Sequence, residues 1–101
     1  MGVLAQDDLT PAEVLKAATK ALDAGRYEDA AASMYTYLSM VEGSEMPRVI
    51  AIAQDTRFKL ATILLNTDPP RLDEAAAVLQ EYIDTPLAEK PRQAMKMLAT
   101  C

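Results

Sequence analysis

Apolar residues recur every three or four positions along most of this chain, and this spacing predicts five helices. The first helix begins after Thr10, where the sequence Thr-Pro-Ala-Glu forms a capping box, and ends at Gly25, which supplies the left-handed conformation of a helix C-terminus. The second helix carries Glu28 and Asp29 in its first turn, where carboxylates complement the helix dipole, and runs to about Val41. Because so tight a turn joins them, these two helices must be antiparallel neighbours.

The third predicted helix is longer than the first two. Ser44 is its expected N-cap, Pro47 lies in its first turn, and its apolar residues continue up to Asp68-Pro69-Pro70, which stops it. A fourth helix follows over residues 71–83, and Pro91 opens a fifth that runs into the end of the chain. The sequence shows no sustained period-two alternation and no hairpin turn signal, so it predicts no strands.

A segment of fourteen residues occurs twice, 45 residues apart. Residues 25–38 read GRYEDAAASMYTYL and residues 70–83 read PRLDEAAAVLQEYI, with five identical positions. The helices before these segments also correspond, since residues 15–19 (LKAAT) align with residues 58–62 (FKLAT). A period of this size predicts stacked helix–turn–helix units rather than a domain with one core. The expected domain, residues 10–101, comprises one unit at 10–42, a second at 45–85 and a half unit at 90–101.

The first unit resembles the tetratricopeptide repeat through Ala18, the Gly25-Arg26-Tyr27 turn, Ala30, Met34 and Leu38. In that family a small residue midway along the first helix packs against an Ala that begins the second helix. The second unit matches through Ala61 and Ala75, with two extra residues and with Pro70 in place of the turn glycine. The resemblance implies an all-α solenoid of two units plus a fifth helix. Its long units are similar to those of bacterial envelope scaffold proteins.

Tetratricopeptide-repeat proteins usually bind an extended or helical peptide in a concave groove lined by the first helix of each unit. The resemblance therefore implies a non-catalytic scaffold whose partner is a protein or peptide. Mapped onto this chain, the groove would be lined by Leu15, Thr19, Leu22, Asp23, Asp55, Phe58, Thr62 and Asn66. Family members that clamp a C-terminal carboxylate use Lys, Arg and Asn at such places, and the Leu15, Thr19 and Phe58 of this chain depart from that pattern.

The fifth helix indicates an alternative function, structural self-association. A solenoid needs polar terminal caps, whereas this helix has no following partner for its apolar side chains. The expected self-association edge consists of Met95, Met97 and Leu98. Either a second copy of the chain covers this edge in a homo-oligomer, or sequence beyond residue 101 does, in which case the chain is a fragment of a longer repeat protein.

The tyrosines at matching positions of the two units, Tyr37 and Tyr82, have two interpretations. They either pack between helices or contribute, with Tyr35, to an aromatic recognition patch. Packing between the helices is the expected role, because only Tyr35 lies off the apolar face of its helix.

Composition excludes several other classes of function. A net charge of −5 disfavours nucleic acid, whose phosphates need clustered basic residues, and no apolar run is long enough for membrane insertion. The chain has no histidine, no glycine-rich phosphate loop and no nucleotide fingerprint, so we expect no catalytic residues and no cofactor. Zinc sites use His and Cys, and Cys101 is the single cysteine, so we expect no metal.

Residues 1–9 are expected to form a flexible segment. Within Met1–Ala5, the sequence Val3-Leu4-Ala5 has the small-residue pattern that precedes signal-peptidase cleavage. Either this is the stub of a signal peptide, which would place the protein in the bacterial periplasm or cell envelope, or it is a coincidence and the protein is cytoplasmic.

Overall fold

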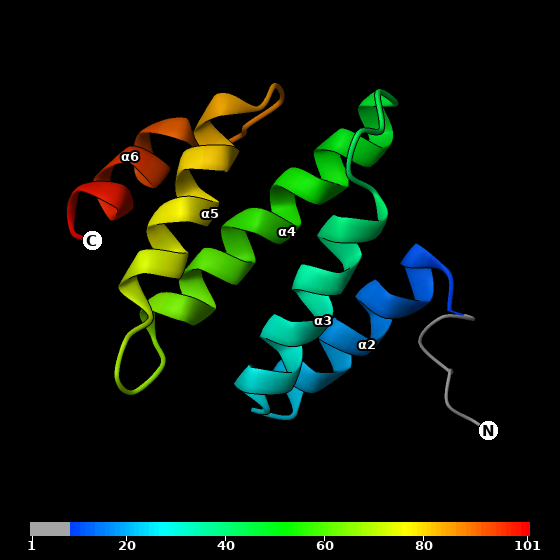
Figure 1. Ribbon diagram of the computed structural model, residues 1–101, viewed down its shortest axis with the longest axis horizontal. Coiled ribbons are helices and arrows are strands. Elements are labelled where there is room, and N and C mark those ends of the chain that lie inside the picture. The colour runs from blue at the N-terminus through cyan, green and yellow to red at the C-terminus, as the bar shows by residue number, and fades with distance from the viewer. Residues whose placement is uncertain (1–8) are drawn as a thin grey trace. The chain divides into compact units, whose positions relative to one another are not determined.

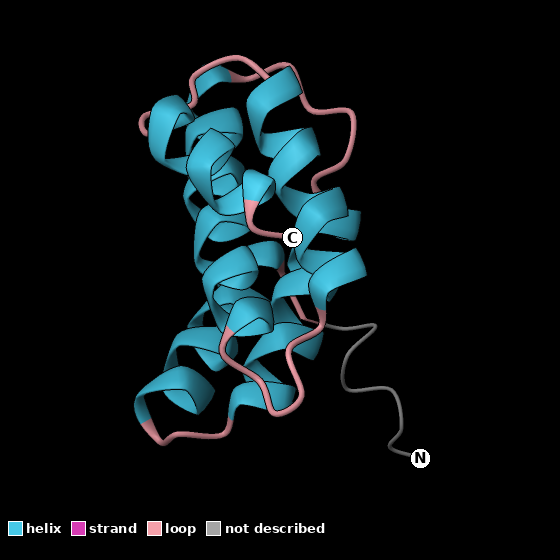
Figure 2. Ribbon diagram, turned by 90° about the vertical axis from the view of Figure 1, so that its left-hand side faces the viewer, coloured by secondary structure: helices cyan, strands magenta, loops and turns pink. Residues whose placement is uncertain are grey.

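The computed structural model describes residues 9–101 and consists of helices joined by turns and loops (Figures 1 and 2). The helices are α2 (Pro11–Asp23), α3 (Tyr27–Met40), α4 (Pro47–Leu65), α5 (Leu72–Asp84) and α6 (Pro91–Ala99). No strand occurs within these residues, so the predicted all-α class is confirmed. The expected signal-peptide pattern at 3–5, and all but residue 9 of the expected flexible segment, lie outside the described residues. The chain divides after Glu42 into two compact units.

The first unit is the pair α2 and α3. The predicted capping box is present, since Glu13 N donates to the Thr10 hydroxyl at 3.2 Å and Thr10 N donates to the Glu13 carboxylate at 2.9 Å. Gly25 ends the α2 turn with a φ of +78°, in the left-handed region that favours glycine. Most of the buried residues are small, which lets the two helices approach closely: Val14, Ala18 and Ala21 of α2, and Ala30, Ala31, Met34 and Tyr37 of α3. Burial raises the pKa of the Tyr37 hydroxyl.

The second unit contains α4, α5 and α6, and α5 packs against both of the others. Its apolar core consists of Ala53, Leu60, Ala61, Ile63 and Leu64 of α4, of Ala75, Val78, Leu79 and Tyr82 of α5, and of Ala94 of α6. Two polar residues of α4, Gln54 and Thr56, are buried with them. The Thr56 hydroxyl donates to the carbonyl of Ile52 on its own helix at 2.8 Å, so the amide of Gln54 is the buried polar group that needs partners from another element.

The turns into α3 and α5 have the same local geometry. The N-cap residues Arg26 and Arg71 have nearly equal backbone angles, with φ and ψ of −89° and 76° in the first and −92° and 74° in the second. Arg26 N donates to the carbonyl of Ala21 and Arg71 N to that of Leu64, each at 2.9 Å. The two extra residues of the second turn thus leave the start of the following helix unchanged.

The prediction that Ser44 caps the third helix is wrong. Met46 is the N-cap of α4, in an extended conformation, and Pro47 is the first helical residue. Proline explains the shift, because it disfavours helical geometry in the residue before it and itself needs no hydrogen-bond acceptor. Ser44 instead accepts a hydrogen bond from Met46 N at 3.4 Å, within the loop before the helix.

Ala18 and Ala17 offer a matched test of the close packing in the first unit, because Ala18 is fully buried and its neighbour Ala17 is exposed. Ala18→Leu should lower the free energy of unfolding by about 1–3 kcal/mol through overpacking, whereas Ala17→Leu should change it by less than about 0.5 kcal/mol. Urea denaturation followed by circular dichroism measures both. Equal effects of the two substitutions would contradict the assigned interface.

Candidate functional site

The second unit has a surface cavity of about 300 Å³. It joins three elements that are far apart in the sequence: α4, the end of α5 and the segment that leads into α6. Its lining residues are Ala51, Ile52, Gln54, Asp55, Phe58, Tyr82, Glu89 and Lys90. The cavity therefore combines an aromatic and aliphatic surface with charged side chains.

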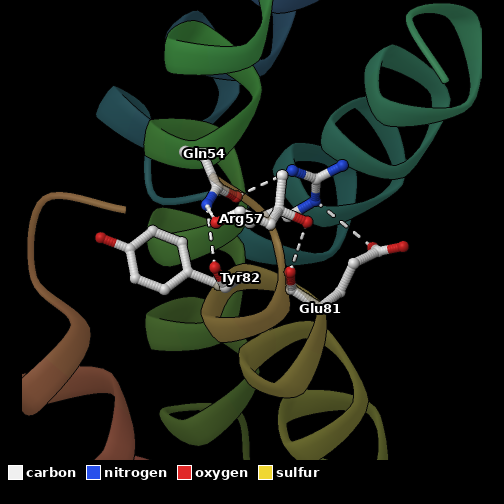
Figure 3. A network of polar contacts seen from close by, with 5 residues as sticks. Gln54, Arg57, Glu81 and Tyr82 are labelled. Carbon is white, nitrogen blue, oxygen red and sulfur yellow. Dashed lines mark hydrogen bonds and ion pairs between the residues drawn. The ribbon is translucent and has the colours of Figure 1, made fainter. Parts of the chain in front are cut away.

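The Gln54 side chain connects α4 to the end of α5 (Figure 3). Gln54 is only 1% exposed. Its amide nitrogen donates to the carbonyl of Tyr82 at 2.8 Å and to that of Thr85 at 3.0 Å, and its amide oxygen accepts from the Arg57 guanidinium at 2.8 Å. Both amide hydrogens and the amide oxygen are thus engaged, which burial of an amide requires.

These hydrogen bonds cap the C-terminus of α5. The last carbonyls of a helix have no partners within the helix, and many helices satisfy them with a glycine in the left-handed conformation. Here the C-cap is Thr85 in an extended conformation, and Gln54 supplies two donors from another helix. The end of α5 is consequently fixed to the middle of α4.

Arg57 keeps the Gln54 amide in this orientation. Its guanidinium donates to the Gln54 oxygen and also pairs with the Glu81 carboxylate at 3.3 Å (Figure 3). The Arg57 side chain is 13% exposed and that of Glu81 is 62% exposed, so the ion pair lies at the boundary with solvent. Such a pair adds little stability by itself. Because a guanidinium only donates hydrogen bonds, however, Arg57 must face the amide oxygen of Gln54, which leaves the amide nitrogen facing the carbonyls of α5.

Tyr82 connects the end of α5 to the start of α6. Its hydroxyl accepts a hydrogen bond at 2.8 Å from the backbone N–H of Lys90, which is the N-cap residue of α6. Its ring lies 5.5 Å from the Phe58 ring, tilted by 58°, a favourable arrangement for two aromatic side chains. The Lys90 ammonium lies 5.1 Å from the centre of the same Phe58 ring, within the range of a cation–π interaction.

The structure brings two of the predicted groove residues of the second unit into this cavity. Asp55 and Phe58 line it, whereas Thr62 and Asn66 lie farther along α4 and are exposed outside it. The Thr62 hydroxyl donates to the carbonyl of Phe58 at 3.0 Å, and the side-chain amide of Asn66, the C-cap residue of α4, donates to that of Thr62 at 2.7 Å. Both side chains therefore bond back to carbonyls of α4.

The other predicted groove residues belong to α2 in the first unit. Leu15 and Leu22 are half-buried, and Thr19 and Asp23 are exposed. The Thr19 hydroxyl donates to the carbonyl of Leu15 at 3.2 Å, as Thr62 does to Phe58. A cavity of about 360 Å³ in this unit contains none of the predicted residues; it is lined by Ala17, Lys20, Ala21, Arg26, Asp29, Ala32 and Ser33.

The predicted self-association edge is only partly exposed. Met95 has 53% of its surface exposed, whereas Met97 and Leu98 are half-buried. Leu87, in the loop before α6, is 50% exposed and was not part of the predicted edge.

Six residues that line the cavity were not among the predicted groove residues: Ala51, Ile52, Gln54, Tyr82, Glu89 and Lys90. Gln54 had a usable signal, because it lies four residues after Ile50 and seven before Ala61, on the apolar stripe of its helix. A polar residue at such a position must find hydrogen-bond partners once the helix packs. The loop residues Glu89 and Lys90 had no comparable pattern.

Neither a metal centre nor a membrane span is indicated for residues 9–101. No group of three or more His, Cys, Asp or Glu side chains there is placed to hold an ion, and none of the described helices combines the length and apolarity needed to cross a bilayer. A scan against models of protein families found no match, and searches of curated proteins and of solved structures found none either.

Gln54→Ala should lower the free energy of unfolding by about 2–4 kcal/mol, because it leaves the carbonyls of Tyr82 and Thr85 without these donors and opens a buried space. Gln80→Ala is the matched control, since Gln80 is exposed on α5 and its side chain bonds, among residues 9–101, only to Asp84 of its own helix. Urea denaturation should show a change below about 0.5 kcal/mol for the control. A similarly small change for Gln54→Ala would refute the capping role.

Proposed function

We propose that this chain is a non-catalytic protein-interaction module that binds a peptide segment of a partner protein at the cavity of its second unit. The observation that carries the proposal is the cavity itself, whose walls are held together by the buried hydrogen bond of Gln54 to α5 and the partly buried one of Tyr82 to Lys90. A binding surface fixed in advance loses less conformational entropy when a ligand arrives. A volume of about 300 Å³ suits one or two anchoring side chains of a peptide.

The chemistry of the lining supports binding rather than catalysis. Ile52 and Phe58 provide apolar and aromatic surface, and Asp55, Glu89 and Lys90 provide charges, the combination typical of a recognition site. The lining contains no Ser, Cys or His, the residue types that most often act as nucleophile or proton shuttle.

The resemblance to the tetratricopeptide repeat supports the same function. In that family the first helix of each unit lines the peptide groove, and Asp55 and Phe58 lie on α4, the first helix of the second unit. The shared turn geometry at Arg26 and Arg71 favours a common ancestry of the two units. We therefore also propose that the units form a solenoid and that the protein serves as a scaffold for protein interactions.

A second candidate function is self-association through α6, favoured by the exposure of Met95 and Leu87. Apolar side chains on one helix and the adjoining loop can contribute to an interface between two copies of a chain.

The peptide-binding proposal can be tested with peptides selected from a random phage-displayed library on the immobilised protein. Ile52→Glu should weaken the selected peptides about tenfold or more in fluorescence anisotropy, because it puts a charge on the apolar wall of the cavity. Met40→Glu is the control, since Met40 is on α3 and has the same 39% exposure as Ile52. Phe58 is a poorer choice, because it also contacts Tyr82.

Both variants should keep the melting temperature of the parent within a few degrees, as exposed positions allow. The proposal fails if selection yields no binder, or if Ile52→Glu and Met40→Glu bind the selected peptides equally well.

Self-association makes its own prediction. Sedimentation equilibrium should show dimers at micromolar concentration, and Met95→Lys should dissociate them because it places a charge within an apolar contact. The control is Met46→Lys, at an exposed methionine before α4. A monomer at all concentrations would eliminate this candidate.

A further inference from the structure

Three charged residues line the cavity, and they differ in how they are paired. Asp55 forms an ion pair with Lys59 at 2.9 Å, one turn away on α4. The Lys90 ammonium lies over the Phe58 ring. The Glu89 carboxylate forms no hydrogen bond or ion pair with any of residues 9–101. The cavity therefore presents one negative charge that nothing in the described part of the chain neutralises.

The contact of Lys90 with Phe58 shows that the face of this ring can bind a cation. The backbone N–H of Lys90 is held by the Tyr82 hydroxyl, but its side chain is exposed and reaches the ring along a flexible stem. A cation–π contact at an exposed site is weak, so the ammonium can leave the ring while the backbone stays in place. Lys90 thus occupies the aromatic wall of the cavity as an exchangeable cation.

Tyr82 offers a hydrogen-bond donor at the same site. The residue is only 2% exposed, and its hydroxyl oxygen accepts from Lys90 N. A phenolic hydroxyl also donates one hydrogen bond, and the proton of Tyr82 has no acceptor among residues 9–101. A buried donor of this kind is favourably completed by an acceptor that a ligand brings, such as a peptide carbonyl.

We propose that the cavity selects a basic peptide segment. An arginine or lysine side chain of the partner replaces the Lys90 ammonium on Phe58 and pairs with the Glu89 carboxylate, while a peptide carbonyl accepts a hydrogen bond from the Tyr82 hydroxyl. Arginine is favoured over lysine because its planar guanidinium stacks on an aromatic ring and can bond a carboxylate through two N–H groups. The net charge of −5 adds long-range attraction for a basic partner. This inference rests on the proposed function and specifies the partner's charge.

The test uses three tripeptides with blocked ends: acetyl-Ala-Arg-Ala-amide, acetyl-Ala-Glu-Ala-amide and acetyl-Ala-Leu-Ala-amide. Each is titrated into the ¹⁵N-labelled protein while amide chemical shifts are recorded by NMR. The arginine peptide should shift the amides of Ile52, Asp55, Phe58 and Glu89 in a saturable way, and the glutamate peptide should not. Equal shifts with all three peptides, or none with the arginine peptide, would overturn the inference.

Two variants separate the roles of the charged residues. Glu89→Gln should weaken the arginine peptide about threefold, the size expected for one exposed ion pair. Lys90→Met should strengthen it about threefold, because it removes a competing cation and a like charge but keeps the stem and the backbone N–H. Glu45→Gln, at an exposed carboxylate outside the cavity lining, should change nothing. Weaker binding by Lys90→Met would show that Lys90 contacts the ligand rather than competing with it. That result would contradict the proposed replacement of the Lys90 ammonium by a cation of the ligand.

The phage-selected peptides distinguish this inference from the proposed function. If they depend on Ile52 but are acidic or uncharged, the chain is a peptide-binding module and the selection for basic partners is wrong. If the selected peptides bind the Ile52→Glu variant as well as the parent protein, the proposed function fails as well. Enrichment of arginine in peptides that depend on both Ile52 and Glu89 supports both conclusions.

Discussion

The structure of the second unit depends on the side-chain amide of Gln54. This amide spans 28 residues of sequence to the carbonyl of Tyr82 and also reaches that of Thr85, so it determines where α5 ends against α4. With the end of α5 fixed, the Tyr82 hydroxyl is placed to hold Lys90 N at the start of α6. All three walls of the cavity thus follow from one buried, fully hydrogen-bonded amide, whose burial would be costly without these partners.

The cavity arises from features that distinguish the two units rather than from those they share. With the alignment of 43 residues between the first helices, Gln54 corresponds to Pro11 and Asp55 to Ala12. Since Pro11 begins α2 and α4 begins seven residues before Gln54, the added length of α4 carries two cavity residues, Ala51 and Ile52. Gln54, which caps α5, takes the place of the proline that begins α2. The repeated Arg-x-acidic-acidic-Ala segments, by contrast, perform the same task in both units, which is to start the second helix.

The recognition site that we propose combines hydrogen-bonded walls with an exchangeable cation. The hydrogen bonds of Gln54 and Tyr82 are buried or partly buried and hold the backbone, whereas Glu89 and the Lys90 side chain are exposed, and Lys90 makes only a weak contact with the Phe58 ring. A ligand can therefore exchange one weak contact for another without disturbing the fold. The buried hydrogen bonds are strong because they are shielded from water, whereas the contacts of exposed charged side chains are weak because water competes for them.

The sequence by itself determined the helices, because most of their ends depend on local chemistry; the end of α5, which Gln54 caps from another helix, is different. The Thr10 capping box, the left-handed Gly25 and the prolines at 47 and 91 act on backbone groups within a few residues, so their effect can be predicted without knowing the fold. Ser44 was the exception, since a proline three residues later decided the helix start.

For the site, the resemblance to the tetratricopeptide repeat selected Asp55 and Phe58, and both line the cavity, but it could not show which other segments lie over that part of α4. Tertiary structure decided that the end of α5 and the loop before α6 lie over Phe58, so that Tyr82, Glu89 and Lys90 join the cavity and Thr62 and Asn66 do not. The reason is that these contacts join residues 24 to 32 positions apart, namely Phe58 with Tyr82 and Phe58 with Lys90, and no local pattern encodes such distances.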